Sequence, residues 1–74
     1  MIQTIITDNS GKKETFASEN KFEAIVIGMR AAFRLLKGSK DLELWMDKSP
    51  QIFNLLWNQK FVSFANLISI ELNA

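Results

Sequence analysis

Cysteine, histidine and tyrosine are absent from this 74-residue sequence, and proline occurs only once. Without cysteine the chain has no disulfide and no thiolate chemistry. Without histidine it lacks the most common general base, the most common zinc ligand and every Ser-His or Cys-His arrangement. Any metal would have to be held by carboxylates, which suit hard ions such as Mg²⁺ or Mn²⁺. We therefore expect no catalytic, cofactor-binding or metal-binding residues, and a protein that is not an enzyme.

Long apolar runs and long runs of one charge are absent as well. No apolar stretch approaches the roughly 18 residues that a membrane span needs. The N-terminal stretch "MIQTIITDNSGKK" lacks the basic region and apolar core of a signal peptide. The net charge of +1 is too small to indicate nucleic acid or membrane as a partner. These features predict a cytoplasmic protein that makes no membrane contact.

The residues that are present predict one folded domain over residues 1–74. Apolar residues make up 47% of the chain, and no linker or internal repeat divides it. The segments "MIQTIIT" and "KETFA" have strand character, and the turn residues of "DNSGKK" separate them, which predicts a β-hairpin. The tail "KFVSFANLISIELN" alternates like a strand, and it forms either one strand or two short strands divided at Ala65-Asn66.

A helix is predicted over about 19–37, with Ser18 as its N-cap and Gly38 as its stop. Its large apolar residues recur at spacings of four and three, so we expect one stripe to pack against a sheet. That stripe comprises Phe22, Val26, Met29, Phe33 and Leu36. Gly28, in the middle of the helix, indicates that the helix approaches the sheet closely.

The next segment, "DLELWM", is predicted to be a strand, and Ser49-Pro50 is predicted to begin a second helix. The two faces of this strand would carry Leu42, Leu44 and Met46 on one side and Glu43, Trp45 and Asp47 on the other. The element order is then β-β-α-β-α-β. The predicted fold is α+β, a mixed sheet covered by two helices on one face.

Residues 18–56 carry a resemblance to a known family. The segment "SENKFEAIVIGMRAAFRLLKGSKDLELWMDKSPQIFNLL" resembles the central helix, strand and helix of ribonuclease H-like proteins. Within it, "NKFE" resembles the opening of the helix that carries a catalytic glutamate, and "LELWMD" resembles a strand that ends in aspartate. Upstream, "IITDNSG" resembles the first strand of that family. The resemblance implies Asp8, Glu23 and Asp47 as ligands of two divalent ions about 4 Å apart.

The three acids also have a structural interpretation. Asp8 fits a hairpin turn, Glu23 fits the first turn of a helix, where the macrodipole favours negative charge, and Asp47 fits a solvent-facing turn. Aligning "EAIVIGMRAA" on the family pattern places Lys21 at the position of the glutamate. The later acidic residue of the family and its histidine neighbour are absent.

Two groups of residues are candidates for binding a partner. Trp45 would project from the open face of the sheet between Glu43 and Asp47, and exposed tryptophans are enriched in binding hot spots. The second group is a cationic helix face, which would contact phosphate or an acidic protein unless it is simply solvated. This face comprises Arg30, Arg34 and Lys37.

The sequence therefore predicts a small non-enzymatic interaction protein that binds another protein. Its size and composition fit a phage or mobile-element encoded inhibitor or regulator. One alternative is a minimal or degenerate ribonuclease H-like protein that binds nucleic acid, which the charge does not favour. Another is a structural subunit that oligomerises through an edge strand, and a homodimer is also open.

Overall fold

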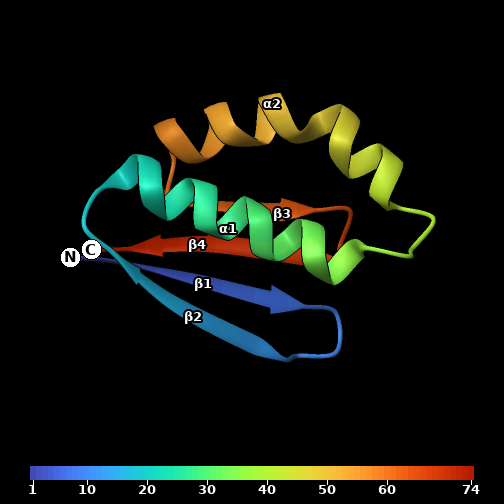
Figure 1. Cartoon of the computed structure of the whole chain (residues 1–74), viewed down its shortest axis with the longest axis horizontal. Coiled ribbons are helices and arrows are strands. Elements are labelled where there is room, and N and C mark those ends of the chain that lie inside the picture. The colour runs from blue at the N-terminus through green and yellow to red at the C-terminus, as the bar shows by residue number, and fades with distance from the viewer.

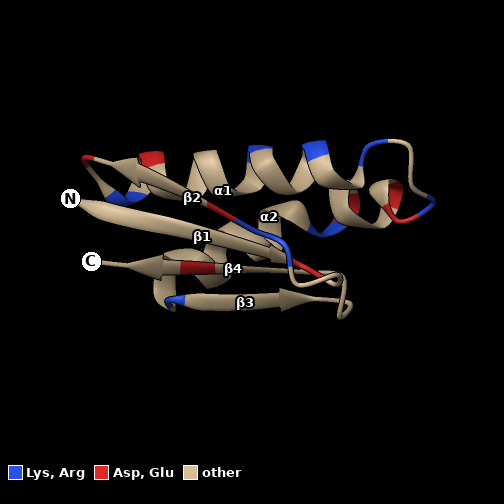
Figure 2. Cartoon of the chain, turned by 90° about the horizontal axis from the view of Figure 1, so that it is seen from below, with Lys and Arg blue, Asp and Glu red and all other residues tan.

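A computed structural model describes all residues of the chain, from Met1 to Ala74. The elements are β1 (Ile2–Asp8), β2 (Lys13–Ser18), α1 (Lys21–Leu36), α2 (Leu42–Asn58), β3 (Phe61–Phe64) and β4 (Ile68–Asn73). The four strands form one sheet in the order β2-β1-β4-β3, and both helices lie side by side on one of its faces (Figures 1 and 2). The predicted α+β class and the single small domain are confirmed. Every strand pair is antiparallel, so the expectation of a mixed sheet was wrong.

The segment predicted as a third strand is the first part of α2, so the predicted element order was also wrong. Five or six residues that alternate fit a strand and a short piece of amphipathic helix equally well. The longer pattern decides, because Trp45, Ile52 and Leu56 are all buried and are spaced by seven and four residues. That spacing places the three side chains on one helical face, toward the sheet.

The predicted helix start at Ser49-Pro50 is the middle of α2. Proline has no N–H, so the carbonyl oxygen of Met46, four residues earlier, loses its usual helical donor. The Ser49 hydroxyl donates a hydrogen bond to this oxygen instead, at 3.0 Å. Ser49 therefore satisfies the carbonyl that Pro50 leaves open, and the helix continues to Asn58.

The predicted turn between the first two strands is present. The β1–β2 hairpin is held at its turn by Asp8, whose Oδ1 accepts hydrogen bonds from the backbone N–H and hydroxyl of Ser10 and from the N–H of Lys12. The tail, which the sequence left open as one strand or two, forms two strands. Ala65 and Asn66 have φ values of 51° and 57°, and the left-handed backbone there turns β3 into β4.

The first helix runs close to its predicted bounds but has a different cap. The Oδ1 of Asn20 accepts a hydrogen bond from the N–H of Glu23 at 2.8 Å, so Asn20 is the N-cap. Ser18, the predicted cap, is instead the last residue of β2. It is buried, and its hydroxyl has no hydrogen-bond partner.

Helix α1 packs on the sheet through small residues. A Cβ atom at Gly28 would lie 2.9 Å from Cγ2 of Thr4 and 3.0 Å from Cγ2 of Ile70. Both distances are shorter than an ordinary van der Waals contact between carbon atoms. The Thr4 hydroxyl, fully buried, donates to the carbonyl of Ala24 at 3.0 Å. The close approach predicted from Gly28 is confirmed. The buried residues of α1 are Ala24, Ile25, Gly28, Ala31, Ala32 and Leu36.

Candidate functional site

Trp45, the leading candidate for partner binding, belongs to the core. Its side chain is 2% exposed, and its ring meets that of Phe64 edge to face, with centroids 5.2 Å apart. The expectation that Trp45 projects from the open face of the sheet was wrong. The expectation assumed strand geometry for residues 42–46, whereas the helix turns Trp45 toward the sheet.

The other five candidates are exposed, on the two helices. Glu43 and Asp47 lie one helical turn apart on α2, Arg30 and Arg34 lie on α1, and Lys37 is the C-cap of α1. Arg34 donates to the carboxylate of Glu14 at 2.7 Å, and this is the one salt bridge in the chain. Arg30, Lys37, Glu43 and Asp47 therefore have no ionic partner within the molecule. A role for these residues in binding stays a prediction.

The structure does not gather the three acids of the ribonuclease H-like resemblance. No group of three or more acidic side chains is placed to hold a metal ion. The pKa of Asp8 lies below its ordinary value because the Ser10 hydroxyl, above all, donates to the ionised carboxylate, and the N–H groups of Ser10 and Lys12 add to this. Asp8 thus shapes the hairpin turn, as its structural interpretation predicted.

A groove runs between the two helices on the outer side of the helix layer. It has a volume of about 400 Å³, and most of its lining is apolar. The residues that line it, here called the helix groove, are Val26, Met29, Arg30, Phe33, Trp45, Met46, Ser49 and Phe53. Trp45 contributes to its lining although only 2% of that residue is exposed.

Aromatic side chains continue the apolar surface from one end of the groove. The ring of Phe53 meets Phe22 edge to face at 5.7 Å and stacks on Trp57 at 6.4 Å, measured between ring centroids. Lys21 donates a hydrogen bond to the carbonyl of Trp57, and its Nζ lies 5.5 Å from the centre of the indole ring. Lys21 therefore covers one side of Trp57, Phe53 packs partly against the core, and Phe22 stays exposed.

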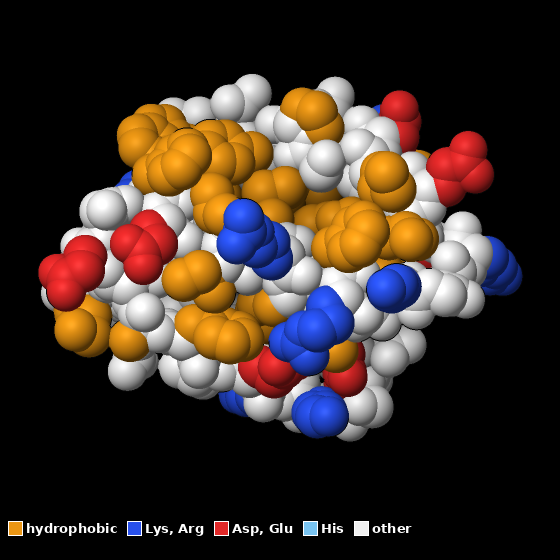
Figure 3. Space-filling view, viewed as in Figure 1, with side chains coloured by type: hydrophobic (Ala, Val, Ile, Leu, Met, Phe, Trp, Pro, Cys, Tyr) orange, Lys and Arg blue, Asp and Glu red, His pale blue; other side chains and the backbone are white.

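The outer side of the helix layer exposes much of this apolar surface. The exposed fractions are 57% for Phe22, 39% for Phe33, 55% for Met46 and 48% for Trp57. Figure 3 shows hydrophobic side chains gathered over both helices, with cationic side chains among them. Of the stripe that was expected to pack on the sheet, Val26, Met29 and Phe33 line the outer groove, whereas Leu36 is buried as expected. The burial predicted for Phe33 was wrong.

The signal for this surface was present in the sequence. Helix α1 carries a second stripe of small residues, of which Ala24, Gly28 and Ala31 are members, beside the stripe of large ones. The periodicity of either stripe is helical, so periodicity alone does not decide which one faces the sheet. Gly28 was the informative residue, because its own stripe is the one that makes the close approach.

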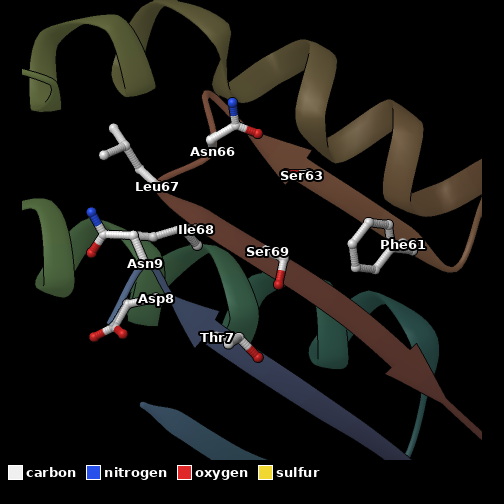
Figure 4. Close-up of a pocket in the computed structure, with 9 residues that line it drawn as sticks. All are labelled: Thr7, Asp8, Asn9, Phe61, Ser63, Asn66, Leu67, Ile68 and Ser69. Atoms are coloured by element: carbon white, nitrogen blue, oxygen red, sulfur yellow. The ribbon is translucent and has the colours of Figure 1, made fainter. Parts of the chain in front are cut away.

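A second hollow, of about 320 Å³, lies between the two hairpin turns. Figure 4 shows that the Asp8 carboxylate points away from Phe61 and Ser69, and its Oδ1 is already used by the turn. The remaining lining is mostly neutral. It comprises Thr7, Asn9, Phe61, Ser63, Asn66, Leu67, Ile68 and Ser69.

No family model, no curated protein and no solved structure matches the chain. The ribonuclease H-like resemblance stays a prediction, and the strand that it required over residues 42–47 is helical. Neither helix combines the length and the apolar character needed to cross a membrane.

Proposed function

We propose that this chain is a non-enzymatic interaction protein that binds a protein partner through the helix groove and the aromatic cluster beside it. The observation that carries the proposal is the exposure of four large apolar side chains on one surface, Phe22, Phe33, Met46 and Trp57. Contiguous apolar surface of this kind marks interaction sites in soluble proteins, and aromatic residues and methionine are enriched in interfaces.

The opposite side of the molecule is a weaker candidate. The face of the sheet that the helices leave open carries mostly small or polar residues, and its large apolar residues are the exposed Phe61 and the half-buried Ile5. Its other members include Gln3, Thr7, Thr15, Ala17, Ser63, Ser69, Glu71 and Asn73. A partner would remove far less apolar surface from water on this face than on the helix layer.

The size of the effect supports binding on the helix layer. Full burial of one large apolar side chain contributes about 1.5–3 kcal/mol. The four exposed side chains are each roughly half buried already, so covering them would contribute on the order of 3–6 kcal/mol before the entropic cost of association. Hot-spot residues of this kind carry most of the free energy in many protein interfaces.

A site-specific cross-link tests the proposal without assuming which protein binds. We would replace Met46 by the photo-reactive residue p-benzoylphenylalanine, and irradiate the cells that naturally produce the protein. A matched control would carry the same residue at Thr15, which is exposed on the open face of the sheet.

The expected result is a cross-linked protein from position 46, identified by mass spectrometry of the linked peptides, and none from position 15. A second copy of this chain counts as such a protein. Cross-links from position 15 alone, or from neither position, would contradict the proposal. The phage-encoded inhibitor or regulator and the cytoplasmic location stay predictions attached to this proposal.

A further inference from the structure

We infer that the occupant of the helix groove is a second copy of this chain, docked helix layer to helix layer about a two-fold axis that runs along the groove. This inference rests on the proposed function, because it names the partner of the same surface. The resulting particle would have the helices of both copies in the middle and a sheet on each outside.

The first argument is the distribution of unpaired charge on the two sides of the groove. Arg30 stands on α1 and Lys37 directly follows it as its C-cap, whereas Glu43 and Asp47 stand on α2, and none of the four makes a salt bridge within the chain. Figure 3 shows acidic side chains at the end where α2 begins and cationic ones over α1. Lys40 borders the same hollow as the two acids without pairing with either.

The second argument is the position of these charges along the helices. The two helices are joined by the short connection 37–41, so the end of α1 and the start of α2 lie at the same end of the layer (Figure 1). Arg30 lies six residues before the end of α1 at Leu36, and Asp47 lies five residues after the start of α2 at Leu42. At a rise of about 1.5 Å per residue, Arg30 and Asp47 lie at nearly the same distance along the groove from the end where the two helices are joined.

A two-fold axis along the groove would bring the opposite charges of the two helices together at matching positions. It places α1 of one copy over α2 of the other and keeps the ends of the helices in register. Arg30 of each copy then faces Asp47 of the other, and Lys37 faces Glu43, each pair occurring twice. An axis across the helices would stack α1 on α1 instead, and would bring the two Arg30 guanidinium groups together because Arg30 lies near the middle of α1.

The apolar residues fit the same arrangement. Phe33 and Met46 line the groove at the end that carries the charges, and Phe22 and Trp57 belong to the aromatic cluster at the other end. Exchange of α1 for α2 across the axis sets Phe33 against Met46 and Phe22 against Trp57 of the second copy. The surface therefore complements itself in charge and in apolar area, so no different partner is needed to cover it.

Sedimentation equilibrium of the purified chain over a wide range of concentrations tests the inference. We expect a monomer–dimer equilibrium. In a dimer of Arg30→Glu, both symmetric pairs become a glutamate facing Asp47. In a dimer of Asp47→Lys, both pairs become a lysine facing Arg30. Each variant alone should weaken dimerisation by at least about tenfold, since two pairs change from attraction to repulsion.

The decisive measurement is an equimolar mixture of the two variants. In a dimer with one copy of each, the new glutamate faces the new lysine on one side, and the native Arg30 faces the native Asp47 on the other. The mixture should therefore dimerise as tightly as the wild-type chain. Lys13→Glu and Glu71→Lys are matched controls, because they make the same charge changes at exposed positions on the sheet.

Three outcomes overturn the inference. A wild-type chain that stays monomeric at every concentration would show that the dimer does not form. A dimer that the two sheet controls weaken as much as the groove variants uses another surface, and a mixture that fails to restore association excludes the axis along the groove. If the chain is monomeric while position 46 cross-links to a different protein, the proposed function stands and only the second copy is rejected.

Discussion

The closest contact of α1 with the sheet and the outer side of the same helix use apolar residues of different size. On the inner side of α1, Ala24, Gly28 and Ala31 pack on the sheet, and the backbone of the helix comes close to Thr4. The outer side carries large side chains such as Phe33, which stay partly exposed. The size of an apolar side chain therefore does not tell which side of a helix faces the core.

The geometry of the close approach explains this division. A side chain of even one carbon at Gly28 would meet the methyl groups of Thr4 and Ile70. A large residue has no room at Gly28 itself, whereas Ile25 and Leu36 are buried elsewhere along α1 and Phe33 stands on its outer surface. The fold and the binding surface then depend on different residues of the same helix, and substitutions can separate the two.

The largest expected effect on the free energy of unfolding comes from removing the buried ring of Trp45. Trp45→Ala should lower the free energy of unfolding by about 3–5 kcal/mol, because the ring is buried against Phe64. That loss is a large part of the roughly 5–15 kcal/mol available to a small domain. Denaturant unfolding followed by circular dichroism measures it.

The outer-side tryptophan is the matched control. Trp57→Ala should lower the free energy of unfolding by less than about 1.5 kcal/mol, because half of the side chain is already in solvent. Equal losses at Trp45 and Trp57 would mean that the helix layer has no distinct outer side.

The second prediction concerns the contact between α1 and the sheet. Alanine in place of glycine stabilises an ordinary exposed helix by about 1 kcal/mol. Gly28→Ala should instead destabilise this chain by about 1–3 kcal/mol, because the new methyl group overpacks the contact with Thr4 and Ile70. The sign of the change in unfolding free energy is the result to check.

A second substitution shows where that destabilisation arises. Thr4→Ser removes the methyl group nearest to Gly28 and keeps the hydroxyl that donates to Ala24. Gly28→Ala should therefore be less harmful in the Thr4→Ser background than in the wild-type chain. A double-mutant cycle without any coupling would place the strain elsewhere.

The third prediction is smaller and concerns the groove. Phe33→Ala should change the unfolding free energy of the dilute chain by less than about 1.5 kcal/mol, because Phe33 stands on the outer side. The measurement belongs at low concentration, where association adds no stability. Outright unfolding of this variant would show that the large stripe belongs to the core after all.

The smallest effect lies outside the helix layer, at the hairpin turn. The folded-state pKa of Asp8 is lowered from 3.8, so its contribution to stability is present above pH 3.8 and is lost as the pH falls through the lowered pKa. The free energy of unfolding should thus decrease less on acidification in Asp8→Asn than in the wild-type chain, as denaturant unfolding at a series of pH values measures. Identical titration curves would show that the turn bonds to Asp8 carry no stability.

Local patterns predicted the parts of the fold that local chemistry determines. The hairpin at Asp8 depends on turn residues and the first helix on a long helical period, and the structure contains both. The split at Ala65-Asn66, which the sequence left open, is also present. The strand prediction for residues 42–46 was wrong because so short a segment fits both the two-residue period of a strand and the 3.6-residue period of a helix. Pro50 failed as a helix start because Ser49 replaces the missing hydrogen-bond donor at Met46.

The candidate site was predictable only in part, for a physical reason. Charged residues such as Arg30 and Asp47 are exposed in almost any fold, so their accessibility followed from their chemistry. Trp45 was placed on the wrong side because residues 42–46 are helical and do not form the predicted strand. Phe33 was placed on the wrong side because its position depends on how close α1 comes to the sheet. That distance is set by contacts between residues far apart in the chain, which periodicity does not report.

Hydroxyl-radical footprinting tests most directly whether the outer side of the helix layer is a binding surface. Met46 on the helix layer and Phe61 on the sheet are 55% and 51% exposed, so each is an internal reference for the other. Oxidation of each residue would be measured in the dilute purified chain and in the cells that produce it. We predict that Met46 becomes protected in the cells while Phe61 does not. Equal oxidation of Met46 in both samples, with or without protection of Phe61, would contradict the account.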